Sequence, residues 1–402
     1  MAAQSYSTPQ FFRRMPNALL ARYFHGKGLF ADLDFVAMKP AKQQPLLAAW
    51  DALPDATQVE LEAELTEVHA LCDEGGWRAL QEAASQVLCT DEAAAVVTLL
   101  AGLEDHAAQA MTAFLDHRTL WETAEQYRRT DALAYWKKLT TRLPDVDLMP
   151  VAVAKCLALS EAIKAYLQRV EHRGRNCRVE YRRRGGKDCF FAFPRDHATK
   201  HMEWADEDMV PRRHSPAFDL IFVYERARGA LDLYCRRAPK AAQPLQDIFA
   251  TTVLGMERLV RDPKDGKAYD LAPLLDPAFT FTRSLDSGIG DVQLRKMRLT
   301  RRCRTGRHLT LQAANTAALH AMLNEVCQSV RLADYELTQV ELRAQVSESG
   351  RAKLKKVAFF VGTPDTCSLK HEGVDNLLRG MLVASRIEPR KPAVADVAAA
   401  AS

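Results

Sequence analysis

The chain of 402 residues has no long hydrophobic run. Its most apolar stretch, Ala93–Leu103, falls far short of the roughly 20 residues that cross a bilayer as a helix. The N-terminus, MAAQSYSTPQFFRR, also lacks the apolar core of about 7 to 15 residues that a secretory signal requires. We therefore predict a cytoplasmic protein without a membrane partner.

The short motifs of the common enzyme classes are missing as well. The sequence contains no GxxxxGK[ST] phosphate loop, no GxSxG nucleophile elbow, no HExxH and no CxxC. These absences argue against P-loop nucleotide hydrolysis, α/β-hydrolase chemistry and the common zinc sites. The nine cysteines are scattered and odd in number, which fits reduced thiols and not a disulfide framework. We predict no cofactor and favour a non-catalytic role.

Charge is distributed unevenly along the chain. Residues 1–150 hold 13 basic and 21 acidic side chains, whereas residues 151–402 hold 42 and 30. An excess of positive charge in the second part indicates a polyanion or an acidic protein as partner. The acidic first part indicates a contact with another protein, or serves solubility alone.

The acidic part has the hydrophobic period of helices. Leu61, Leu65, Val68 and Cys72 would form one buried stripe, and a capping box at Thr57 would start that helix. Segments 53–65 and 103–115 resemble each other, so this part is either a short helical repeat or a coincidence of two leucine-rich helices. A longer helix is predicted after Pro150, with one side lined by Val153, Leu157, Ser160, Ile163, Leu167 and Val170.

The basic part has short strand-like runs separated by glycine-containing turns. A tight turn at Gly185-Gly186 predicts the first hairpin, and further turns lie near Gly229, Gly306 and Gly350. Helical patterns follow three of these hairpins. The predicted fold class is therefore α+β, with an all-helical N-terminal domain followed by an antiparallel-sheet domain of repeated β-hairpin-helix units.

The same patterns predict the domain limits. These are a flexible N-terminus over 1–10, a helical domain over 11–172, an α+β domain over 173–388 with a possible internal boundary near 262–277, and a disordered tail over 389–402.

Two dense arginine clusters are the most distinctive feature of the sequence. Because a planar guanidinium can hold a phosphate through two parallel hydrogen bonds, arginine in this density predicts contact with nucleic acid. Tyr181, Phe190 and Phe191 beside the first cluster could stack on bases if their rings are exposed. The first arginine cluster (169–187) contains Arg169 and the predicted phosphate contacts Arg173, Arg175, Arg178, Arg182, Arg183, Arg184 and Lys187; the second (295–307) contains Arg295, Lys296, Arg298, Arg301, Arg302, Arg304 and Arg307.

Simpler interpretations remain open for these clusters. The outer face of any hairpin must be polar, and acidic side chains of the same chain could neutralise the guanidinium groups. A weaker candidate site is a divalent metal bound by His197 and His201, with Asp219 nearby. The leading expectation is a nucleic-acid-binding or scaffold subunit of a cytoplasmic bacterial complex. The alternatives are a metal-dependent hydrolase or nuclease centred on these residues, and a protein–protein adaptor.

Overall fold

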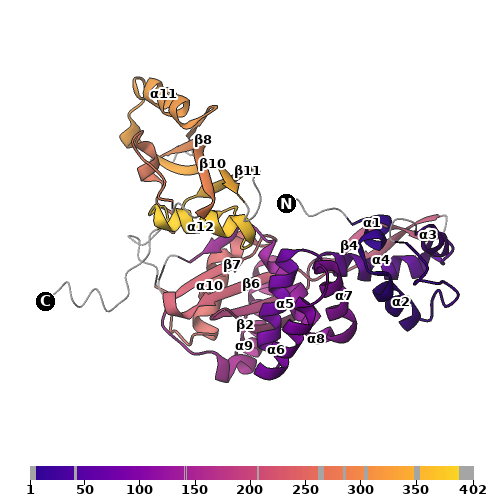
Figure 1. The fold of residues 1–402 in the computed structure, drawn as a ribbon. Helices are drawn as coiled ribbons and strands as arrows, with labels where there is room; N and C mark the ends of the chain where they lie inside the picture. The colour runs from indigo at the N-terminus through magenta and orange to yellow at the C-terminus, as the bar shows by residue number, and fades with distance from the viewer. Residues whose placement is uncertain are drawn as a thin grey trace. The chain divides into compact units, whose positions relative to one another are not determined.

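The computed structural model describes residues 6–39, 43–139, 141, 143–205, 208–260, 267–283, 287–302, 307–347 and 354–388. The chain forms two compact units. The helical unit comprises residues 1–132 and 202–210, and the sheet unit comprises residues 133–201 and 211–402. The predicted tail 389–402 and most of the turn that contains Arg304 lie outside the described residues. Figure 1 shows the elements of both units.

In the described residues, eight helices precede the first strand. They are α1 (Thr8–Arg14), α2 (Asn17–Gly26), α3 (Gln44–Asp51), α4 (Asp55–His69), α5 (Glu74–Val87), α6 (Thr90–Ala101), α7 (His106–Asp116) and α8 (Arg118–Asp131). The predicted stripe on α4 is buried, with Leu61, Leu65, Val68 and Cys72 all in one core with the other helices. The α4 helix begins after Pro54 and not at the predicted capping box of Thr57.

A close approach of the backbone in α5 gives the first testable consequence. Asp73 caps α5 by accepting a hydrogen bond from the Gly76 amide. A Cβ atom on Gly76 would lie 2.1 Å from the carbonyl oxygen of Leu71. Because that neighbour is backbone, we expect Gly76→Ala to lower the free energy of unfolding by about 1–3 kcal/mol, measured by urea denaturation.

Gly380 provides the matched control for this substitution. It lies within helix α12 (Gly373–Ala384), and nothing lies within 4 Å of the position that its Cβ would take. Gly380→Ala is expected to raise the free energy of unfolding by up to about 1 kcal/mol through helix propensity. Equal urea midpoints for the two variants would contradict this interpretation of Gly76.

The sheet unit contains a ten-stranded antiparallel sheet with the order β2-β3-β6-β7-β1-β12-β11-β10-β8-β9. A separate two-stranded sheet pairs β4 with β5. The strands are β1 (Trp136–Lys138), β2 (Cys177–Arg184), β3 (Lys187–Pro194), β4 (Thr199–Ala205), β5 (Asp208–His214), β6 (Leu220–Glu225), β7 (Ala230–Tyr234), β8 (Ile289–Arg301), β9 (His308–Gln312), β10 (Tyr335–Ser347), β11 (Leu354–Gly362) and β12 (Thr366–Cys367).

The large sheet has two halves with separate cores. Helices α9 (Ala152–Glu171) and α10 (Ala242–Thr252) pack on the first half-sheet, β2-β3-β6-β7 (Figure 1). Helices α11 (Thr316–Cys327) and α12 pack on the second half-sheet, β11-β10-β8-β9. Among the residues that the structure describes, only the short strands β1 and β12 join the two halves through backbone pairing. The fold class is thus α+β, with a helical region followed by an antiparallel sheet and interspersed helices.

Helix α9 differs from its prediction in two respects. It belongs to the sheet unit, because its buried side packs with residues of β3 and β6 in the core of the first half-sheet. That side carries Cys156, Leu159, Ile163 and Leu167. The predicted stripe is therefore wrong at both ends, where Val153 is 80% and Val170 is 52% exposed, because the sheet meets α9 along a row shifted around the helix.

The order of hairpins and helices matches the expected pattern in part. Hairpins β6–β7, β8–β9 and β10–β11 are each followed by a helix, with β12 intervening in the last case. Hairpin β2–β3 is followed by strands β4 and β5 instead. Repetition of one hairpin-helix unit stays a prediction. In the part of the chain that the structure describes, no helix is both long and apolar enough to span a membrane.

Candidate nucleic-acid interface

The two arginine clusters lie near opposite edges of the ten-stranded sheet. The first cluster is centred on the hairpin β2–β3, and β2 is one edge strand. The second is centred on the hairpin β8–β9, and β9 is the other edge strand. Eight strand spacings separate β2 from β8, which corresponds to about 38 Å along a flat sheet. Each cluster therefore has its own electrostatic surroundings.

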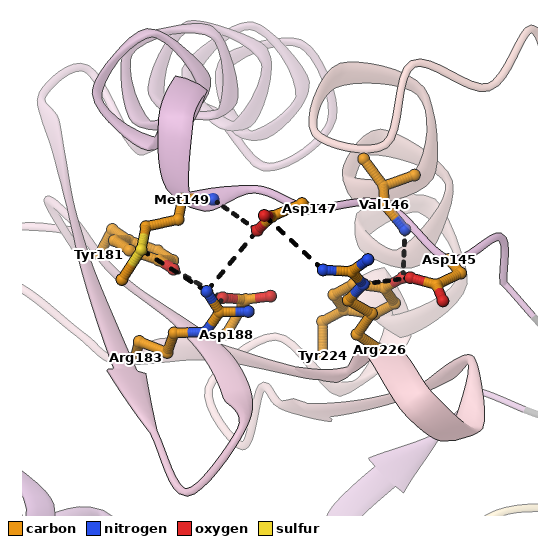
Figure 2. Close-up of polar contacts among 9 residues, drawn as sticks. All are labelled: Asp145, Val146, Asp147, Met149, Tyr181, Arg183, Asp188, Tyr224 and Arg226. Atoms are coloured by element: carbon orange, nitrogen blue, oxygen red, sulfur yellow. Dashed lines mark hydrogen bonds and ion pairs between the residues drawn. The ribbon is translucent and has the colours of Figure 1, made fainter.

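Carboxylates of the same chain surround the guanidinium of Arg183 in the first cluster (Figure 2). Its Nη1 lies 3.6 Å from Asp147 and its Nε lies 3.6 Å from Asp188. Asp188 is fully buried and accepts a hydrogen bond of 2.6 Å from the Tyr181 hydroxyl. Burial, followed by that hydrogen bond, raises the pKa of Tyr181 above its ordinary value. Arg183 is thus held by an internal network.

The acidic loop before α9 also neutralises the turn between β6 and β7. Asp145 accepts a hydrogen bond from Arg226, and Asp147 lies 3.7 Å from the same guanidinium. The loop is fixed by Tyr224, whose hydroxyl donates to the Pro144 carbonyl and accepts from the Val146 amide (Figure 2). Asp147 therefore forms ion pairs with two arginines that are far apart in sequence, Arg183 and Arg226.

The other members of the first cluster are mostly paired too. Arg173, whose side chain is only 7% exposed, contacts Glu171 and Asp196 at 2.5 and 2.8 Å. Glu180 lies 2.9 Å from Arg178 and 3.9 Å from Arg182. Lys187 lies 3.7 Å from Glu225, Arg184 also has a partner, and Arg175 is exposed. Alternating charges of this kind on an edge strand hinder pairing with another sheet.

The second cluster lies in different surroundings. Arg295 donates to the Ala314 carbonyl at a bulge of β8. Arg301 is half-buried at the end of β8, and Arg302 and Arg307 are exposed beside the β8–β9 turn. Arg304 lies outside the described residues. Lys296 and Arg298 are on either side of the buried Met297, so alternation along the strand directs both away from the helices.

Strands β10 and β11 extend this basic surface. Arg343 lies between the buried Leu342 and Ala344, so its side chain is on the face opposite the core. Lys356 is opposite Gln345 in the register of β10 and β11 and is exposed. We call the surface formed by Lys296, Arg298, Arg343 and Lys356 the basic face.

The cations of the basic face are not held in ion pairs. Within the described ranges, none of the four forms an ion pair or donates a side-chain hydrogen bond. Glu341 is opposite Lys296 in register, and Asp291 lies near the start of β8. The basic face is also uncovered, since Thr310, Gln312 and Ala358 on the same side of the sheet are exposed.

Sequence reasoning missed Arg343 and Lys356. Arg343 stands apart from other basic residues, and Lys356 ends the run RAKLKK (351–356), which has only one arginine, so a search for dense arginine clusters passes over both. The available signal was the alternation in β10, where polar residues at 339, 341, 343 and 345 separate the buried residues Val340, Leu342, Ala344 and Val346. Such alternation predicts one core face and one open face.

The candidate metal ligands do not form a cluster. Strand β4 begins at Thr199, just after His197, and contains His201. The His201 ring packs edge-to-face on His214, with 4.3 Å between the ring centroids. Asp219 directly precedes β6. Among the residues whose placement is described, no three His, Cys, Asp or Glu side chains are close enough to hold a metal ion.

A separate cluster of buried charged side chains lies where the two half-sheets join. Lys138 on β1 donates to Glu388 at 2.6 Å and lies 3.8 Å from Asp232 on β7, and all three side chains are largely buried. Burial lowers the pKa of Lys138, but Asp232 and Glu388 outweigh it and hold the pKa above its ordinary value. Burial raises the pKa of Asp232, but Lys138 together with His371, Arg379 and Lys187 outweighs burial and holds this pKa below its ordinary value. Lys138 thus forms ion pairs with both carboxylates, although the buried Oδ1 of Asp232 has no hydrogen-bond partner among the described residues. The ion pairs indicate a structural role.

His371 and Arg379 complete this junction cluster. Arg379 donates to the carbonyl oxygens of Leu369 and Lys370. His371 packs edge-to-face on Trp136, with 5.1 Å between ring centroids. Burial, reinforced by the charge of Arg379, lowers the pKa of His371 to about 3. The imidazole is therefore neutral at physiological pH.

Comparisons of the chain with protein-family models, curated proteins and solved structures give no match.

Proposed function

We propose that the protein is a non-catalytic nucleic-acid-binding subunit of a cytoplasmic complex, and that the basic face contacts the phosphates. The observation that carries this proposal is the contrast between the two clusters. Most cations around β2 form ion pairs with carboxylates of the same chain. In contrast, no ion pair involves the four cations of the basic face, Lys296, Arg298, Arg343 and Lys356, in the described ranges.

Electrostatics favours an extended polyanion as the ligand. Exposed cations without partners gain the most when a phosphate displaces water and counterions, because no internal ion pair has to be broken. The four cations lie on three adjacent strands, β8, β10 and β11, and so form a surface and not a single anion pocket. Cations distributed over three strands can contact several successive phosphates of one nucleic-acid strand.

The surface is built by two successive segments, β8–β9–α11 and β10–β11–α12, whose helices share the core of the second half-sheet. We include in the proposal that these segments are copies of one hairpin-helix unit, as the sequence pattern predicts. In that arrangement each unit supplies cations to the same face of the sheet.

The test is fluorescence anisotropy of the full chain with short labelled oligonucleotides of single-stranded DNA, duplex DNA and RNA. If four phosphates are contacted, raising salt from about 50 to about 200 mM weakens binding by about 50- to 150-fold. Changing Lys296, Arg298, Arg343 and Lys356 to Gln is expected to raise Kd at least tenfold and to flatten the salt dependence. An unchanged Kd would contradict the proposal.

The first arginine cluster offers a control with the same change of charge. Changing Arg169, Arg175, Arg178 and Lys187 to Gln removes four cations from the same unit and leaves the basic face intact. We expect this variant to keep the affinity within about threefold and to keep the salt slope, since counterion release depends on the phosphates contacted. An equal loss in both variants would indicate attraction by net charge alone.

A further inference from the structure

The basic face contains one aromatic side chain, Phe360 on β11. Its neighbours along the strand, Phe359 and Val361, are buried in the core of the second half-sheet. Alternation therefore places the Phe360 ring on the opposite side, the side of Arg343 and Lys356. Glu341 is opposite it in the register with β10. An aromatic ring on a charged open sheet is not explained by the core.

Phe360 belongs to none of the four hydrophobic clusters found in the described part of the chain. Its side chain is half-buried, and the positions next to it carry small residues. Ala358 and Gly362 precede and follow it on the same face, and Ser368 is hydrogen-bonded to its backbone. Ala358 and Gly362 are too small to cover the ring along the strand, so its exposed part can receive another flat group.

Charge indicates which part of a nucleic acid lies over this ring. Glu341 would repel a phosphate at that position, while Lys296, on the far side of Glu341, attracts one. Two strand spacings separate Lys296 from Phe360, about 10 Å. An uncharged base over Phe360 with its phosphates nearer the cations satisfies both constraints. Stacking of this kind needs an unpaired base, which a duplex does not supply.

We propose that the basic face binds single-stranded nucleic acid with one base stacked on Phe360. This inference rests on the function proposed above and adds the strandedness of the ligand and the position of one base. Binding does not require a particular sequence, since every base has a flat face that can stack.

The test compares single-stranded and duplex oligonucleotides in the same anisotropy assay with full-length variants. Phe360→Ala is expected to weaken single-strand binding by about five- to hundredfold and to leave the salt slope unchanged. Phe360→Leu, which keeps apolar volume, should show the same loss, and Phe360→Trp should retain binding and show fluorescence quenching by the oligonucleotide. Wild-type affinity in both the Ala and Leu variants overturns the inference.

A second variant covers the ring without removing it. A Cβ on Gly362 would be 3.6 Å from its nearest neighbour, the Thr338 carbonyl oxygen, which is an ordinary contact. Gly362→Val is therefore expected to fold normally and to weaken single-strand binding. If the four-cation variant loses binding but the Phe360 and Gly362 variants do not, the proposed function stands and the stacked base is rejected. If wild-type protein binds no oligonucleotide, both proposals fail.

Discussion

Replacing Lys138 with methionine is expected to lower the free energy of unfolding by about 3 kcal/mol. The substitution leaves Asp232 and Glu388 at the junction of the half-sheets without their shared cation. Their side chains are only 16% and 12% exposed, so water cannot replace the lost partner fully. Uncompensated buried charge costs about 3–5 kcal/mol, and the remaining exposure places Lys138 at the lower end.

Two further variants separate this charge effect from packing. Changing Lys138 and Glu388 together to Met removes one cation and one anion and leaves Asp232 near Arg379, so this double variant should recover most of the stability. Lys164, whose partner Glu161 is 71% exposed, provides a surface ion pair for comparison. Lys164→Met is expected to change the free energy of unfolding by less than about 1 kcal/mol. Calorimetry of the full chain measures all three variants, and a double variant no more stable than Lys138→Met would contradict the explanation.

Acid is expected to destabilise the protein through His371 by about 3 kcal/mol between pH 6.5 and pH 4. Burial lowers the pKa of this imidazole from 6.5 to about 3 in the folded protein. Below pH 6.5 the unfolded chain therefore binds a proton that the folded chain does not. Stability is present above pH 6.5 and falls by about 1.4 kcal/mol for each pH unit until the folded pKa is reached.

The His371→Gln variant removes this titration and is the comparison to make. Its stability should fall less steeply than that of the wild type from pH 6.5 to pH 4, measured by urea denaturation at each pH. Above pH 7 the difference between the two proteins should be constant, because the imidazole is neutral in both states there. If the free energies of unfolding of the two proteins fall in parallel from pH 6.5 to pH 4, the pKa of His371 is not lowered in the folded protein.

Hydrophobic periodicity predicted the local structure where one face of an element decides burial. The α4 stripe and the alternation of helices and strands along the chain are examples. Periodicity failed for α9, because Val153 and Leu157 have helical spacing and are still 80% and 67% exposed. Which side of a helix meets a sheet depends on packing between distant segments, and one sequence does not show it.

The sequence predicted that the sheet domain has a basic surface, but it identified only some of the residues that form the candidate site. Density of arginine identified Lys296 and Arg298 but could not show that Asp147, 36 positions earlier in sequence, lies beside Arg183. Pairing of that kind is a long-range property of the fold. Arg343 was missed because it is isolated in the sequence, and Lys356 because it lies in a lysine-rich run with one arginine, although strand pairing places the two on the same face.

The shortness of β1 and β12 has a mechanical consequence. Two residues of β12 and three of β1 carry the backbone ladder between the half-sheets, whereas nine residue pairs join β10 to β11. Each half keeps its own core, so a change in the angle between them would break few backbone hydrogen bonds. The seam between the halves is therefore the most compliant line of the sheet, and side-chain charges hold it where the backbone ladder is thin.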